Sequence, residues 1–191
     1  MAFVAYVTFL VVAFAVRPAL RRRRTGHSGW RPPSSAIDAV AEALWALGLV
    51  STASGPLLAL AGSARTVAAG PLLAGLGLAL LAVGAGIALL AQAQLGEAWK
   101  PSADNGGQGL FMGGLFAWVR HPFYLGCLLA SFGVAAAVPN VLTAAGAVAV
   151  VVAAHLVVRF VEEPELGAAH GRAYQEYARR TGRFLPTLRR R

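Results

Sequence analysis

Hydrophobic residues in this chain are gathered in long runs that short polar segments interrupt. A helical run of about twenty apolar residues matches the ~30 Å hydrocarbon core of a bilayer. The pattern predicts five membrane-spanning helices, over 2–16, 37–60, 67–93, 122–138 and 141–160. We therefore expect an all-α integral membrane protein.

The polar segments predict how these helices are connected. The first helix is expected to stop at Arg17-Pro18, and a linker rich in Ser, Pro and Gly follows it. The turn AGSART joins the second run to the third, and Pro139-Asn140 predicts a tight hairpin between the last two runs. The longest polar segment, 94–114, therefore precedes that hairpin.

The polar tail from Val161 onward predicts a further helix, which Pro186 ends. Its apolar side would consist of Leu166, Tyr174 and Tyr177. The pattern thus divides the chain into the first three spans with their basic linker, 1–94, and a second part, 95–191. The second part holds the polar loop, the helical hairpin and the tail.

Composition and charge support a membrane location. Hydrophobic residues make up 57% of the 191 residues and charged ones 13%, against about a quarter charged in soluble domains. If the N-terminus lies outside a cell membrane, every cation except Arg65 falls on the cytoplasmic side, as the positive-inside rule requires. Topology and contact with anionic membrane lipids therefore explain the net charge of +9 without a nucleic-acid partner. The single cysteine, Cys127, excludes an intrachain disulfide.

Two acidic residues stand near the cytoplasmic start of the second run. Asp38 and Glu42 are four positions apart, which places them on one helical face. Each is either an end residue that extends to water or a group that faces the bundle interior. The glycines and alanines of the third run are typical of close helix packing in lipid.

Polar residues also meet at the predicted mouth of the last hairpin. Arg120, His121 and Tyr124 precede or begin the fourth run, and Glu162 and Glu163 follow the fifth. If the region around the fourth run is helical, the i, i+3 and i, i+4 spacings direct the first three toward one pocket. Each residue alone fits an interfacial anchor or a helix first turn. Together, ionisable groups beside hydrocarbon indicate a functional site.

These segments resemble a known family. GLFAWVRHPFYLG, followed some forty residues later by EEPELGAAHGRAYQEYARRTGRFLP, resembles the isoprenylcysteine carboxyl methyltransferases and their bacterial relatives. LGEAWKPSAD resembles an element upstream of the histidine in those bacterial proteins. The resemblance covers about 95–186. Phe111-Met112-Gly113 and His170 depart from the family pattern.

The resemblance implies an integral-membrane methyltransferase that binds S-adenosylmethionine on the cytoplasmic side, in a pocket that the C-terminal segment closes. Carried over by position, the cofactor-binding residues would be Gly109, Leu110, Phe111, Phe116, His121, Pro122, Tyr124, Glu162 and Glu163. In eukaryotic members an arginine upstream of the glutamates assists the substrate carboxylate. Arg159 is the nearest candidate for that role, although it is displaced by one position.

The acceptor decides what the catalytic residues must do. A carboxylate is already ionised at neutral pH and needs only a cation to hold it, for which Arg120 and Arg159 are the candidates. An amine must first lose a proton, to His121 or to a glutamate. A lipophilic acceptor of the isoprenoid or prenylcysteine carboxylate type is the leading hypothesis, with a phospholipid amine as the alternative.

Other functions fit the sequence less well. Sterol reductases share a similar C-terminal architecture and would bind NADPH, but they are usually larger, and a non-catalytic scaffold is a third hypothesis. The four histidines, His27, His121, His155 and His170, have no metal-ligand spacing, so we expect no metal.

Overall fold

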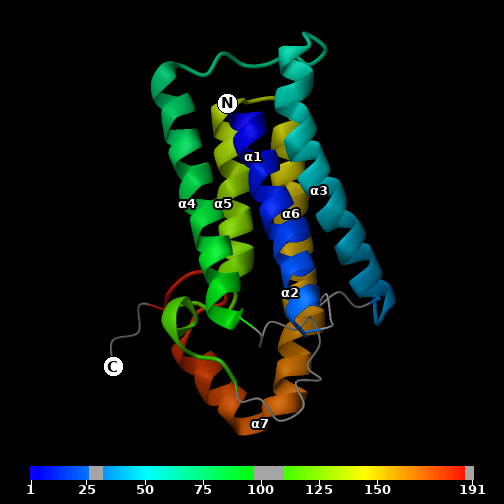
Figure 1. Ribbon diagram of the computed structural model, residues 1–191, viewed down its shortest axis with the longest axis vertical. Coiled ribbons are helices and arrows are strands. Elements are labelled where there is room, and N and C mark those ends of the chain that lie inside the picture. The colour runs from blue at the N-terminus through cyan, green and yellow to red at the C-terminus, as the bar shows by residue number, and fades with distance from the viewer. Residues whose placement is uncertain (26–31, 97–109, 188–191) are drawn as a thin grey trace.

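The structure, a computed structural model, describes residues 1–25, 32–96 and 110–187, which form a bundle of long helices (Figure 1). The first half contains α1 (Ala2–Val11), a π-helical turn (Val12–Val16), α2 (Arg17–Thr25), α3 (Ala36–Leu60) and α4 (Pro71–Leu95). The second half contains a short 3₁₀ turn (Gly114–Ala117), α5 (Pro122–Ala137), α6 (Val141–Val157), a second π-helical turn (Val158–Glu162) and α7 (Glu163–Arg180).

Among the residues that the structure describes, four helices are long and apolar enough to cross a membrane, by length and composition. They are Ala2–Arg23, Ala36–Leu60, Pro71–Leu95 and Val141–Arg180, the last of which becomes polar beyond its π-helical turn. Helix α5 is apolar but has 16 residues, which rise only about 24 Å. The all-α membrane fold is therefore confirmed, and crossing by α5 stays a prediction.

Three predicted helix boundaries were wrong. The first helix does not stop at Arg17-Pro18 but runs on to Thr25. The third begins at Pro71 and not near Val67, because a residue before proline disfavours helical dihedrals while proline itself fits the first turn. The tail helix ends well before Pro186, for a reason given with the site below.

Both π-helical turns end two residues before a proline, Pro18 or Pro164. Proline has no N–H, and its ring clashes with the carbonyl four residues back. At the second turn the Glu163 N–H instead donates to the Val158 carbonyl, five residues back, and the first turn has the same pattern. This wider bonding lets each helix continue through its proline.

Glycines hold the helices in two close pairs. In the α4–α5 pair, Gly84 lies so close to α5 that an added Cβ would overlap the backbone nitrogen of Ala130, and a Cβ on Gly126 would lie 2.5 Å from the Ala88 nitrogen. In the α3–α6 pair, a Cβ on Gly48 would lie 2.8 Å from a Val150 methyl. Small residues of this kind let helix backbones approach in lipid, as the third run predicted.

We predict that Gly84→Ala separates α4 from α5 and destabilises the bundle by about 2 kcal/mol, because the new methyl group meets backbone that cannot move aside. Gly86→Ala on the same helix is the matched control, since nothing lies within 4 Å of its Cβ. Melting temperatures in detergent measure both. Equal effects of the two variants would contradict the close packing.

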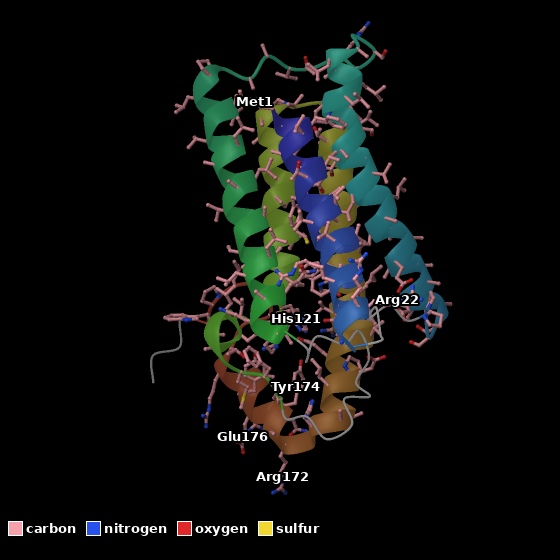
Figure 2. All side chains as sticks on the ribbon, viewed as in Figure 1. Met1, Arg22, His121, Arg172, Tyr174 and Glu176 are labelled. Carbon is pink, nitrogen blue, oxygen red and sulfur yellow. The ribbon has the colours of Figure 1, made fainter. Side chains whose placement is uncertain are left out.

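The N-terminus and the predicted polar site lie at opposite ends of the bundle. Met1 lies at one end, and His121, Tyr174 and Glu176 lie toward the other (Figure 2). This arrangement agrees with the predicted separation of the N-terminus from the polar site, while the orientation in the membrane stays a prediction.

Asp38 is 2% exposed and accepts hydrogen bonds from the Ser34 amide and hydroxyl. Of the two alternatives for this residue, the structure therefore supports a buried group and not an end residue that extends to water.

Candidate functional site

The site forms where the chain enters α5. Helix α5 begins at Pro122, so Arg120 and His121 precede the helix. The prediction that these two residues share a helical face with Tyr124 was therefore wrong. Residues 181–187, the C-terminal strap, fix this segment instead. The Arg120 amide donates to the Gly182 carbonyl at 2.8 Å, and the His121 amide donates to the Arg183 carbonyl at 3.1 Å.

The strap exists because α7 folds back on itself. Gly171 has φ 51° and ψ −122°, a conformation that other residues adopt only with strain, and it kinks α7 in mid-helix. The second half of α7 therefore returns toward the bundle (Figure 1). At Thr181 the backbone becomes extended, and the pairing of Val119 with Gly182 follows. That pairing is why the helix ends at Arg180 and not at Pro186.

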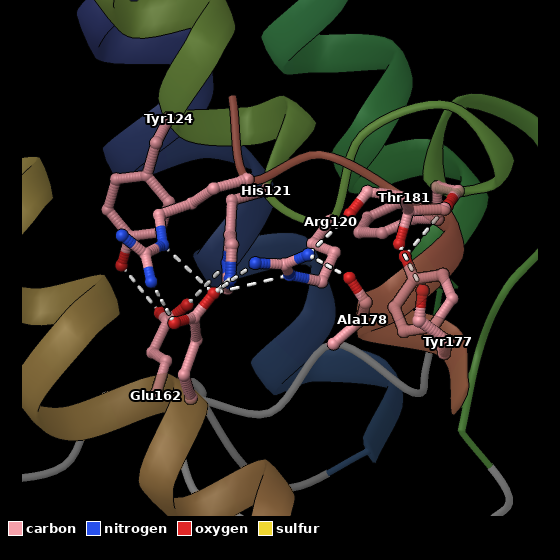
Figure 3. Close-up of polar contacts among 10 residues, drawn as sticks. Arg120, His121, Tyr124, Glu162, Tyr177, Ala178 and Thr181 are labelled. Carbon is pink, nitrogen blue, oxygen red and sulfur yellow. Dashed lines mark hydrogen bonds and ion pairs between the residues drawn. The ribbon is translucent and has the colours of Figure 1, made fainter. Parts of the chain in front are cut away.

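The two glutamates receive different partners (Figure 3). Glu162 accepts a hydrogen bond from the Tyr124 hydroxyl at 2.5 Å, and its other oxygen lies 3.1 Å from His121 Nδ1. Glu163 accepts from Arg120 Nη2 at 2.9 Å and from Arg183 Nη2 at 2.5 Å. The second imidazole nitrogen, Nε2, lies 3.7 Å from Glu163, beyond hydrogen-bond distance.

Arg120 is almost fully engaged by the protein itself. Its Nε and Nη2 both donate to one oxygen of Glu163, and its Nη1 donates to the carbonyls of Ala178 at 2.9 Å and of Thr181. Four of the five guanidinium N–H donors are thereby used. Arg120 thus joins three segments: the entry to α5, the start of α7 and the strap.

The charges at the site shift the pKa values of Glu163 and His121 in opposite directions. Burial opposes charge on Glu163, but its basic neighbours outweigh burial and hold the pKa of this carboxyl well below its usual range. Burial likewise opposes charge on His121, but hydrogen bonding and charge attraction from the two glutamates outweigh it and raise the pKa of the imidazole. Folding therefore shifts the balance toward the ionised form of Glu163 and toward the protonated form of His121.

These shifts predict a stability optimum in mildly acidic solution. The lowered pKa of Glu163 adds stability above about pH 4.3, the value of an unfolded glutamate, and this is lost as pH falls toward the folded value. The raised pKa of His121 adds stability below about pH 6.5, which is lost as pH rises through the folded value. Melting temperature should therefore be highest between about pH 5 and pH 6.5.

Two variants test which residue causes each limb of the profile of melting temperature against pH. Glu163→Gln should flatten the acid limb, and His121→Gln should flatten the alkaline limb. An unchanged alkaline limb in His121→Gln would contradict the assignment to the imidazole.

The other predicted site residues are placed as follows. Pro122 is buried at the start of α5, and Phe116 is buried nearby in the chain, with its ring centroid 5.4 Å from that of Phe111. Phe111 is exposed and Leu110 is partly buried. Gly109 lies outside the described residues.

Arg159 does not join the cluster. Its side chain is exposed, and its guanidinium lies 5.9 Å from the ring centroid of the neighbouring Phe160. Among the described residues, the ion pairs at the site are made by Arg120, Arg183 and His121. Of the two predicted catalytic cations, only Arg120 therefore lies with the glutamates, and a catalytic role for either stays a prediction.

Sequence reasoning missed the residues that the strap contributes. Arg183 binds Glu163 with two nitrogens, and the ring of Phe184 lies 6.2 Å from that of His121. Trp45 of α3 was also missed, and its ring meets Tyr124 edge-on at 5.2 Å. The charge of the basic tail was interpreted through topology and lipid contact, and the arginine–phenylalanine pair shortly before Pro186 was the available signal.

Comparison with known proteins identifies the family of this chain. The family model for phospholipid methyltransferase matches residues 73–173, from α4 into the second half of α7, more than half of the chain. The chain belongs to the phospholipid methyltransferase family. Neither the curated proteins nor the solved structures gave a match.

Membership confirms the prediction of a membrane methyltransferase, and the long apolar helices make the chain a multi-pass membrane protein. The narrower assignment to the isoprenylcysteine branch stays a prediction. The matched segment includes His121, Glu162 and Glu163 but neither α3 nor the strap. Within the described residues no group of His, Cys, Asp or Glu could hold a metal ion.

Proposed function

We propose that this protein transfers a methyl group from S-adenosylmethionine to the amine of a phospholipid headgroup, at a site on the cytoplasmic membrane surface. The proposal departs from the carboxylate acceptor that the sequence favoured. It is supported by family membership together with the electrostatics of the described site. The alternative weighed from sequence, a phospholipid amine, thereby becomes the leading one.

The engagement of Arg120 is the observation that carries this choice. A substrate carboxylate needs a guanidinium with two parallel free donors, and Arg120 spends four donors on Glu163 and two carbonyls. Arg183 binds Glu163 with two nitrogens, and Arg159 is exposed beside Phe160. The described site therefore offers an incoming group its acids more readily than its cations.

The residues fit the cofactor as well. Glu162 is 30% exposed and has a carboxylate that can accept from an ammonium group or from ribose hydroxyls. When bound, S-adenosylmethionine supplies an electrophilic methyl group, and its positive charge suits an acidic wall. We infer that Glu162 holds the cationic end of the cofactor. Tyr124 and His121 orient the carboxylate of Glu162 for this contact. Glu163, by contrast, is neutralised by its arginines.

His121 is suited to take the proton that an amine must lose. In the neutral ring, an Nδ1–H directed at Glu162 leaves Nε2 as the acceptor, and this atom is buried with no hydrogen-bond partner in the described part of the chain. The raised pKa of the imidazole strengthens it as a base. His121 would take the proton of the headgroup ammonium, and the free amine nitrogen could then accept the methyl group that a bound cofactor would supply, with the thioether as the leaving group.

Ligand binding and product chemistry test the proposal. Purified protein in lipid nanodiscs is titrated with S-adenosylhomocysteine and with NADPH, then supplied with methyl-labelled S-adenosylmethionine. The acceptors are phosphatidylethanolamine and a prenylcysteine analogue. We expect the protein to bind S-adenosylhomocysteine. We also expect label on the phospholipid headgroup that mild base does not release as methanol. Base-labile label in the prenylcysteine analogue would restore the carboxylate acceptor, and binding of NADPH alone would contradict a methyltransferase.

A further inference from the structure

Tyr174 occupies an unusual place in the fold. It lies three residues after the kink at Gly171, on the half of α7 that returns toward the bundle. In Figure 2 Tyr174 and His121 lie toward the same end of the molecule. Family matching stops at residue 173, one position before it.

The hydroxyl of Tyr174 is buried without a hydrogen-bond partner. The residue is 6% exposed, and its oxygen has no partner among the described residues. Tyr177, one turn later, shows the ordinary arrangement, because its hydroxyl donates to the Phe116 carbonyl at 2.7 Å. An unsatisfied buried hydroxyl costs free energy and calls for an explanation.

The surroundings of that hydroxyl are charged. Glu163, Arg120 and Arg183 all act electrostatically on Tyr174, so it borders the ion-pair cluster of the proposed site. Glu163 is its negative neighbour, and Arg120 and Arg183 are its positive ones. Burial raises the pKa of Tyr174 to about 12, and the phenol therefore keeps its proton as a donor.

A second unpartnered atom belongs to the same cluster. His121 is 5% exposed, and its Nε2 has no hydrogen-bond partner either. Two buried polar atoms that have no hydrogen-bond partner among the described residues border one set of ion pairs, and they point to a bound polar molecule that would satisfy them. A protonated phenol is a hydrogen-bond donor, and with two guanidinium groups among its charged neighbours it suits an anionic part of that molecule.

We propose that the Tyr174 hydroxyl donates a hydrogen bond to the α-carboxylate of the cofactor's amino-acid end. This inference rests on the proposed function, since it assumes S-adenosylmethionine as the ligand. It adds to the site a residue that the sequence assigned to the apolar side of the tail. Arg120 and Arg183 contribute through their charge and keep their bonds to Glu163.

The test removes the two proposed partners separately. Wild type and Tyr174→Phe are titrated with S-adenosylhomocysteine and with its decarboxylated analogue, which lacks only the α-carboxylate. In wild type, loss of the carboxylate should weaken binding about tenfold, as for a hydrogen bond to a charged group. In Tyr174→Phe both ligands should bind with similar, weak affinity.

Tyr177→Phe is the matched control, because its hydroxyl already has a protein partner. It should lower the melting temperature and keep the discrimination between the two ligands. Tyr174→Phe should leave the melting temperature of the ligand-free protein unchanged or raise it. Should Tyr174→Phe fail to fold, equal affinity of wild type for both ligands would by itself overturn the inference.

The remaining outcomes are also decisive. Discrimination that persists in Tyr174→Phe would overturn the contact and leave the proposed function intact. Absence of any binding of S-adenosylhomocysteine to wild type would overturn the proposed function and this inference with it.

Discussion

Arg120→Ala is expected to release the C-terminal strap and to destabilise the protein by roughly 3 kcal/mol. The side chain is 11% exposed and makes four hydrogen bonds, to Glu163 and to the carbonyls of Ala178 and Thr181. Its loss leaves these acceptors short of donors in a largely buried place. Removing one partner of a buried ion pair costs more than the pair itself contributes, because the remaining charge stays buried.

Melting temperature and limited trypsin digestion measure this effect. Cleavage after Arg180 and Arg183 should accelerate in Arg120→Ala as the strap opens. Arg172→Ala is the matched control, because Arg172 is an exposed cation on α7 (Figure 2). Arg120→Lys should recover only part of the stability, since an ammonium group cannot reproduce the planar fork. Equal digestion of Arg120→Ala and Arg172→Ala would show that the strap does not depend on Arg120.

The hydrophobic pattern predicted most of the fold, because helices in lipid must satisfy their own backbone and bury apolar side chains over a fixed length. It erred where proline was interpreted by its usual effect. Pro18 was expected to end a helix, but the π-helical turn before it absorbs the missing hydrogen bond. Hydropathy does not predict whether a helix ends at a proline or continues through a π-helical turn.

The two halves of the site differed in how far they could be predicted. The meeting of His121 with Glu162 followed from a hairpin whose two-residue connection brings its ends to one depth. The strap did not follow, because its position depends on a single backbone reversal at Gly171. A glycine in a polar helix is ambiguous in sequence, and only the fold shows which way the chain turns.

Glu162→Gln is expected to reduce methyl transfer at least 100-fold while changing stability little. Its carboxylate accepts from the Tyr124 hydroxyl and faces His121 Nδ1, and it remains more exposed than its neighbour Glu163. An amide of the same shape loses the negative charge that favours the cofactor's cationic end. It also no longer stabilises the imidazolium that forms when His121 accepts a proton. Losing one preorganised electrostatic contact typically costs 10²–10³ in rate.

The matched control is Glu176→Gln, an exposed carboxylate on α7 at the same end of the molecule (Figure 2). Single-turnover rates and cofactor affinity separate the two expected contributions of Glu162. A weaker affinity for S-adenosylhomocysteine alone would assign the residue to binding. A slower rate at saturating cofactor, with its pH dependence shifted to lower pH or lost, would assign it to supporting His121, because the Glu162 carboxylate raises the pKa of that imidazole. Activity equal to that of Glu176→Gln would show that Glu162 has neither role, and that the only acid of the pair left unneutralised by arginine is structural.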